Sequence, residues 1–139
     1  MSEVVGFIGL GRMGKSMAIN MTRKGFRLVV HDVNGAAVEE LEQHQARGAA
    51  DAAEVAKASD IVITCLPNSA IVTEVVGRQI VPNLKAGGIV MDMSTISPET
   101  TDAMAAAAKA AGLGFVDAPI GRLASHADRG ESLFMVGGS

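Results

Sequence analysis

The sequence predicts an α/β fold, a doubly wound and mostly parallel sheet with helices on both faces. Short apolar runs alternate with helix-length segments along the 139 residues, which is the pattern of strands joined by right-handed helical crossovers. The first run, residues 4–8, is apolar apart from Gly6, as expected of a strand buried on both faces. A chain of this length suits one domain over residues 1–139.

Turn and capping residues place the remaining elements. The clearest helix follows Ser97, a typical N-cap residue, with Pro98 at its first position and Gly112 just past its end. Asn34 is expected to cap another helix, which Gly48 ends. The strands predicted after the first are residues 26–31, 61–63, 89–91, 114–116 and 132–136. The predicted helices are residues 13–24, 35–47, 51–58, 69–76 and 98–111.

Composition argues against several classes of protein. The net charge of −3 and the absence of Trp and Tyr disfavour a nucleic-acid-binding surface. The single cysteine, Cys65, cannot form an internal disulfide, which fits a reducing compartment. No secretory signal and no membrane-length apolar run are evident, so we expect a cytoplasmic protein without a membrane partner. The chain stops directly after a predicted strand, and we expect it to be a fragment of a longer protein.

A glycine-rich sequence, Gly9-Leu10-Gly11-Arg12-Met13-Gly14, lies between the first predicted strand and helix. In this context the G-x-G-x-x-G spacing predicts a dinucleotide-binding turn of the Rossmann type. Gly9 would permit the turn, Gly11 would let a pyrophosphate approach the backbone, and Gly14 would allow close helix packing. The helix N-terminus would supply free N–H groups to the anion. The alternative is a tight strand–helix turn that binds no ligand.

An acidic residue follows at the expected distance. Asp32 comes at the end of the second predicted strand, where a carboxylate would accept hydrogen bonds from the adenosine ribose. It would also repel a 2′-phosphate, and Val33 and Asn34 follow it rather than an arginine. We therefore expect NAD to be bound in preference to NADP, with these three residues at the cofactor. Alternatively, Asp32 is a turn or capping residue.

Motifs along most of the chain resemble the β-hydroxyacid dehydrogenase family, which includes 3-hydroxyisobutyrate dehydrogenase. The opening residues 7–14 with 17–20 are similar to the signature of that family. Cys65-Leu66-Pro67-Asn68 is similar to its loop after the next central strand. Residues 92–98, Asp-Met-Ser-Thr-Ile-Ser-Pro, and residues 117–120, Asp-Ala-Pro-Ile, are similar to two further family loops.

The resemblance implies further site residues. Leu66, Pro67 and Thr95 are expected along the cofactor, and Ser94 at the substrate. All of them follow predicted strands at their carboxyl ends, where ligands bind in open α/β sheets. The alternatives are a plain strand-ending turn for Leu66-Pro67 and helix capping for Ser94 and Thr95, although Ser97 already suits the cap.

The segment after residue 120 departs from the common family pattern Ser-Gly-Gly. Gly121, Arg122 and Leu123 stand there instead, with Ser125 nearby. A Gly-Arg at this point resembles the sulfolactaldehyde reductase subgroup, in which the arginine meets a sulfonate. These four residues are expected to bind an anionic substrate, because a guanidinium offers several donors to an oxyanion. Alternatively, Arg122 is a solvated loop charge paired with an acidic neighbour.

The function implied by the resemblance is that of an NAD-dependent oxidoreductase. It would interconvert a small 3-hydroxy acid, or a sulfonate analogue, and the aldehyde by hydride transfer. The family's acid–base lysine belongs to a C-terminal helical domain expected beyond Ser139, so no catalytic residue is assigned, and no metal site is expected. The full-length protein is expected to allow homo-oligomers. The alternatives are a stand-alone NAD-sensing module and, less well matched, a 6-phosphogluconate dehydrogenase.

Overall fold

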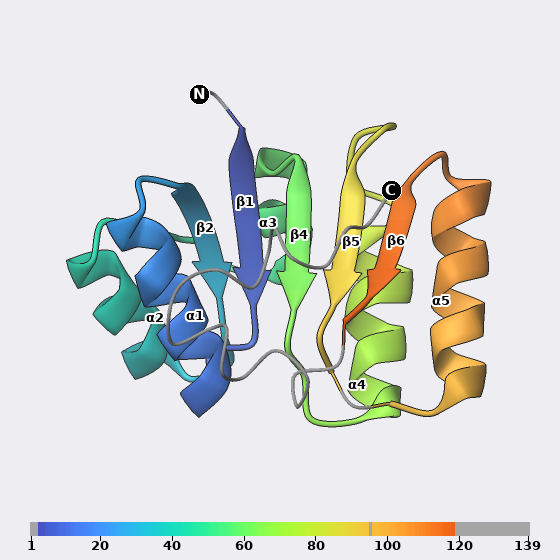
Figure 1. Cartoon of the computed structure of the whole chain (residues 1–139), viewed down its shortest axis with the longest axis horizontal. Helices are drawn as coiled ribbons and strands as arrows, with labels where there is room; N and C mark the ends of the chain where they lie inside the picture. The colour runs from blue at the N-terminus through green and yellow to red at the C-terminus, as the bar shows by residue number, and fades with distance from the viewer. Residues whose placement is uncertain (1–2, 95, 119–139) are drawn as a thin grey trace.

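A six-stranded parallel sheet forms the centre of the computed structural model, which describes residues 3–94 and 96–118 (Figure 1). The strand order is β3-β2-β1-β4-β5-β6, so the chain starts in the middle of the sheet and winds outward in both directions. The strands are β1 (Val4–Ile8), β2 (Arg27–His31), β3 (Arg47–Gly48), β4 (Ile61–Thr64), β5 (Ile89–Asp92) and β6 (Gly114–Asp117). The predicted doubly wound α/β fold is confirmed.

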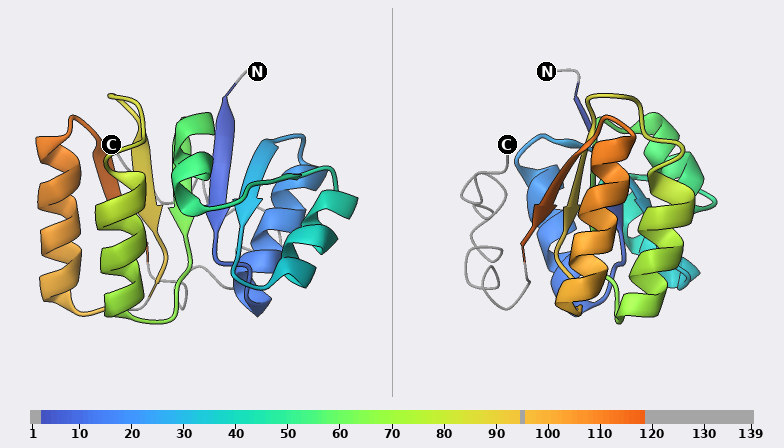
Figure 2. Two further views of the ribbon diagram at one scale, coloured as in Figure 1. Left: turned by 180° about the vertical axis from the view of Figure 1, so that it is seen from behind. Right: turned by 90° about the vertical axis from the view of Figure 1, so that its right-hand side faces the viewer.

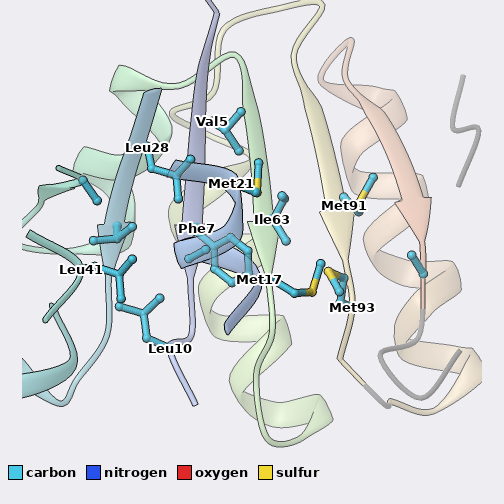
Figure 3. Close-up of a cluster of buried hydrophobic side chains, with 14 residues drawn as sticks. Val5, Phe7, Leu10, Met17, Met21, Leu28, Leu41, Ile63, Met91 and Met93 are labelled. Atoms are coloured by element: carbon cyan, nitrogen blue, oxygen red, sulfur yellow. The ribbon is translucent and has the colours of Figure 1, made fainter. Parts of the chain in front are cut away.

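Helices cover both faces of this sheet (Figure 2). One face carries α1 (Arg12–Arg23) and α2 (Gly35–Gln43), whose side chains pack with Phe7 and Leu28 (Figure 3). The other face carries α3 (Ala52–Ala58), α4 (Ser69–Val72) with its π-helical continuation η1 (Thr73–Ile80), and α5 (Pro98–Ala110). Alternate residues of β1, β2, β4, β5 and β6 enter the two cores, which explains the nearly continuous apolar runs.

Short polar side chains begin four of the helices as N-caps. Asn34 accepts a hydrogen bond from the amide of Ala36, and Ser97 accepts one from Thr100. Asp51 and Asn68 cap α3 and α4 in the same way. These bonds satisfy amides that have no partner inside the helix. The caps predicted at Asn34 and Ser97 are confirmed.

Two predicted boundaries among the described residues are wrong by more than one residue. The helix predicted over residues 35–47 ends at Gln43, because Gln45 adopts a positive φ of 76° and reverses the chain. Arg47 and Gly48 then pair with β2 as a two-residue edge strand, β3. The helix predicted over residues 69–76 continues to Ile80, with π geometry after Val72. The strand predicted over residues 132–136 lies outside the described residues.

The side chain of Asp60 links the amino end of β1 to the loop before β5 through two bonds, together called here the Asp60 clamp. One carboxylate oxygen of Asp60 accepts a hydrogen bond from the Val4 amide at 2.8 Å, and the other accepts one from Lys85 Nζ at 2.7 Å. The bond from Lys85 is the main reason that the pKa of Asp60 is below its ordinary value. The folded chain therefore holds the proton of Asp60 less tightly than the unfolded chain does.

We expect Asp60→Asn to lower the free energy of unfolding at pH 7 by more than at pH 3. The clamp contributes above the ordinary pKa of an aspartate, about 4, and its contribution is lost as the pH falls through the lowered value. Urea unfolding at both pH values measures the difference. Asp102→Asn, on the exposed surface of α5, is the matched control. An equal loss at both pH values would contradict the assigned role of the charge.

Candidate functional site

A cleft of about 640 Å³ opens at the carboxyl ends of β1, β2 and β4. The strand order reverses between β1 and β4, and such a switch point is where open α/β sheets bind ligands. The residues that line the cleft are Ile8, Gly9, Gly11, Met13, Gly14, His31, Asp32, Val33, Ala52, Cys65, Leu66, Pro67, Ile71, Val75 and Gln79.

The three glycines of the turn meet different surroundings. Gly9 has a positive φ of 99°, and a Cβ atom placed on it would lie 2.0 Å from the carbonyl oxygen of Cys65. A Cβ on Gly14 would lie 2.3 Å from the carbonyl oxygen of Gly9. A Cβ on Gly11 would meet no atom within 4 Å, although Gly11 lines the cleft. Gly9 and Gly14 are therefore required by packing, whereas Gly11 leaves open space where a ligand can approach.

The N-terminus of α1 faces this open space with no side-chain cap. Its N-cap residue is Gly11, and its first turn contains no acidic residue. Arg12 and Met13 begin the helix, so their amides belong to the group that has no partner within a helix. Together with the positive end of the helix dipole, such amides bind phosphate groups. The turn therefore fits the pyrophosphate of a dinucleotide.

Asp32 lies half-buried at the end of β2 and holds two loops together. Its carboxylate accepts hydrogen bonds from the amide of Leu10 in the glycine-rich turn and from the amide of Asn34, the latter at 2.8 Å. Each carboxylate oxygen has a second lone pair that can accept from a ribose hydroxyl. Asn34 uses its side-chain oxygen to cap α2, so Asp32 does not serve as that cap.

Apolar side chains form the wall of the cleft next to Asp32. Val33 is fully exposed and Ile71 is 38% exposed, and they are the two large hydrophobic residues at the surface of the described chain. Val75 and Gln79 follow Ile71 at intervals of four along α4 and η1 and also line the cleft. Sequence reasoning missed Ile71, Val75 and Gln79. Their helical spacing was a usable signal, but only the fold shows that this helix lines the same cleft as Asp32.

The loops after β4 and β5 meet beside the cleft. Leu66 and Pro67 line it, and the amide of Leu66 donates a 2.7 Å hydrogen bond to Ser94 Oγ. Ser94 is only 3% exposed, so its hydroxyl oxygen serves this loop contact in the structure. The other predicted residues, Thr95, Gly121, Arg122, Leu123 and Ser125, lie outside the described residues, as does the side chain of Arg12.

Cys65 also lines the cleft and is half-buried. Burial raises the pKa of its thiol, and the nearby carboxylate of Asp92 raises it further. Both effects keep the thiol protonated, and a protonated thiol is a poor nucleophile. Cys65 therefore contributes shape to the cleft.

Comparison with known proteins agrees with this geometry. The family model described as the NAD binding domain of 6-phosphogluconate dehydrogenase matches residues 4–139. The 3-sulfolactaldehyde reductase of Escherichia coli (strain K12) is 39% identical over 137 residues, which are 97% of this chain and 46% of that protein.

Two solved structures show the same fold. The 3-hydroxyisobutyrate dehydrogenase from Salmonella typhimurium superposes with a TM-score of 0.81 and 34% identity, over 85% of this chain and 42% of that one. Psf3 in complex with NADP+ and 2-OPP has a TM-score of 0.74 and 31% identity, over 80% and 40%. The chain spans less than half the length of these relatives. No helix in the described ranges is long and apolar enough to span a membrane. The chain belongs to the NAD-binding domain family of 6-phosphogluconate dehydrogenase and, within it, to the 3-hydroxyisobutyrate dehydrogenase group.

Proposed function

We propose that this chain is the cofactor-binding domain of an NAD-dependent oxidoreductase that interconverts a small 3-hydroxy acid, or a sulfonate analogue, and its aldehyde. The observation that carries the proposal is that one cleft is lined by both the open, uncapped N-terminus of α1 at Gly11 and the residue Asp32, which supplies a carboxylate. That pairing suits a pyrophosphate followed by an adenosine ribose. The apolar wall at Val33 and Ile71 suits the adenine ring.

The choice of NAD over NADP depends on Asp32. A carboxylate that already accepts two amide hydrogen bonds is fixed in place, and it would repel a 2′-phosphate at the same position. No lysine or arginine is among the described side chains that line the cleft. Psf3, a relative, was solved with NADP+, and family membership alone therefore leaves the choice open.

The residues of this chain would bind and orient the cofactor. When bound, the nicotinamide ring supplies the hydride chemistry. Amides at the start of α1 would hold the pyrophosphate, and Asp32 would hold the ribose. Arg122, with Gly121, Leu123 and Ser125, is proposed to meet the anionic group of the substrate, in keeping with the likeness to a 3-sulfolactaldehyde reductase. No described lysine lines the cleft, so no acid–base group is assigned here.

Calorimetric titration with NADH and, separately, NADPH tests the proposal. We expect NADH to bind at least about 10-fold more tightly, since one hydrogen bond to a charged group contributes roughly 1.5–3 kcal/mol. Asp32→Ala should remove most of this preference, whereas the matched control Asp102→Ala on α5 should keep it. Equal affinities in the unmodified chain, or an unchanged preference in Asp32→Ala, would refute the role of Asp32. Failure to bind either nucleotide would refute the proposed function.

A further inference from the structure

A polar network at the carboxyl ends of β4 and β5, called here the Asp92 relay, joins the buried residues Thr64, Asp92 and Ser94 to the main-chain amide of Leu66. Thr64 Oγ1 donates a 2.8 Å hydrogen bond to Asp92 Oδ1, and the amide of Ser94 donates to the same oxygen at 3.2 Å. Ser94 Oγ then accepts from the amide of Leu66 at 2.7 Å. The relay thus joins two strands through Asp92 and two loops through Ser94.

The buried carboxylate of Asp92, at the centre of this network, lowers the free energy of unfolding relative to an apolar residue of similar size. Asp92 is fully buried, and its second oxygen, Oδ2, has no hydrogen-bond partner among the described residues. Burial raises the pKa of Asp92, hydrogen bonds from Ser94 and Thr64 oppose that shift, and the nearby charge of Asp117 adds to it. Buried polar groups in proteins are usually fully paired, and an incompletely paired one calls for an explanation. An apolar side chain would fill this place without that penalty.

The relay acts on main chain that forms the cleft. Leu66, whose amide Ser94 holds, lines the cleft, and so does Cys65 just before it. The carbonyl of Cys65 lies so close to Gly9 that a Cβ there would be 2.0 Å from its oxygen. Residues 65 and 66 are therefore held between Gly9 and Ser94. Movement of this segment would change the wall of the cleft on the side of β4.

The position of the relay in the sheet indicates which part of a dinucleotide it affects. Asp32 ends β2, the glycine-rich turn follows β1, and the relay lies at β4 and β5, on the other side of the switch point. A dinucleotide with its adenosine ribose at Asp32 and its pyrophosphate at Gly11 would extend its other half across β4 toward β5. The relay thus lies on the side of the nicotinamide riboside.

We propose that Asp92 is a positioning residue for the cofactor: through Thr64 and Ser94 it fixes the main chain at Leu66 and so strengthens binding of the nicotinamide half of the dinucleotide. This inference rests on the proposed function, because it requires a dinucleotide in the cleft. It assigns Ser94 a role in holding the loop of Leu66, which is distinct from the substrate contact expected from the sequence.

Affinities of the chain for NADH and for AMP, which lacks the nicotinamide half, test this role. We expect Asp92→Ala and Ser94→Ala each to weaken NADH binding by about 5- to 20-fold, the effect of losing one or two hydrogen bonds. AMP affinity should change by less than about 2-fold in both variants, because AMP would bind at Asp32 and the glycine-rich turn and lacks the half that extends across β4 toward β5. Asp92→Asn keeps an oxygen that can accept from Thr64 and Ser94, and it should recover most of the NADH affinity.

Ser59→Ala is the matched control. Ser59 is as deeply buried as Ser94, and its hydroxyl donates to the carbonyl of Val55 at 2.6 Å, after α3 and outside the cleft. We expect this variant to leave the ratio of NADH to AMP affinity unchanged, even if it lowers stability. Parallel losses of NADH and AMP affinity in Asp92→Ala and Ser94→Ala, or an equal change of the ratio in Ser59→Ala, would overturn the proposal. Unmodified protein that binds neither nucleotide would overturn the proposed function as well.

Discussion

Gly9→Ala is expected to lower the free energy of unfolding by more than about 3 kcal/mol, the range of severe single substitutions. Two penalties combine at this position. The φ of 99° is one that a residue with a Cβ rarely adopts, and the Cβ itself would lie 2.0 Å from the backbone oxygen of Cys65. Because that oxygen belongs to the main chain that Ser94 also holds through Leu66, the strand ends would have to separate.

Two other glycines serve as controls for these penalties, measured by urea unfolding followed by circular dichroism. Gly25 has a similar φ of 93°, but a Cβ there meets nothing within 4 Å, so Gly25→Ala should cost only about 1 kcal/mol. Gly14 has no positive φ, but its Cβ would lie 2.3 Å from the Gly9 oxygen, so Gly14→Ala should give an intermediate loss. Equal losses for Gly9→Ala and Gly25→Ala would contradict the assigned contact with Cys65.

Gly11→Ala should have the opposite profile, with a large effect on ligand binding and little on the fold. Its φ of −68° suits any residue, and a Cβ there meets no protein atom within 4 Å. Stability should therefore change by less than about 1 kcal/mol, as in other helix-capping substitutions. The new methyl group would stand where the pyrophosphate approaches. We expect NADH affinity to fall by more than about 10-fold, as for the loss of one hydrogen bond to a charged group.

Gly35→Ala is the matched control for this variant. Gly35 opens α2, its Cβ would also meet nothing within 4 Å, and it does not line the cleft. The control should bind NADH as the unmodified chain does, with calorimetry for affinity and urea unfolding for stability. A Gly11→Ala variant that keeps full affinity would show that the turn is a structural feature that does not approach the cofactor.

Much of the architecture could be predicted because it depends on local patterns. The apolar runs at Val4–Ile8 and Ile61–Thr64 bury both faces of their strands, so composition alone marks them. Asn34 and Ser97 cap helices through bonds to residues two or three positions ahead, which short sequence windows contain. The prediction failed at Arg47 and Gly48, because a two-residue edge strand is defined by its partner β2 and has no pattern of its own.

The sequence by itself determined the fold class, the glycine-rich turn and the place of Asp32, since each follows from residues adjacent in the chain. Only the tertiary structure decided that Ile71 and Val75 line the same cleft as Asp32, and that Asp92 is buried at the end of β5. The physical reason is distance along the chain. Thr64 and Asp92, like Leu66 and Ser94, are 28 residues apart, and their hydrogen bonds exist only because β4 and β5 pair side by side in register.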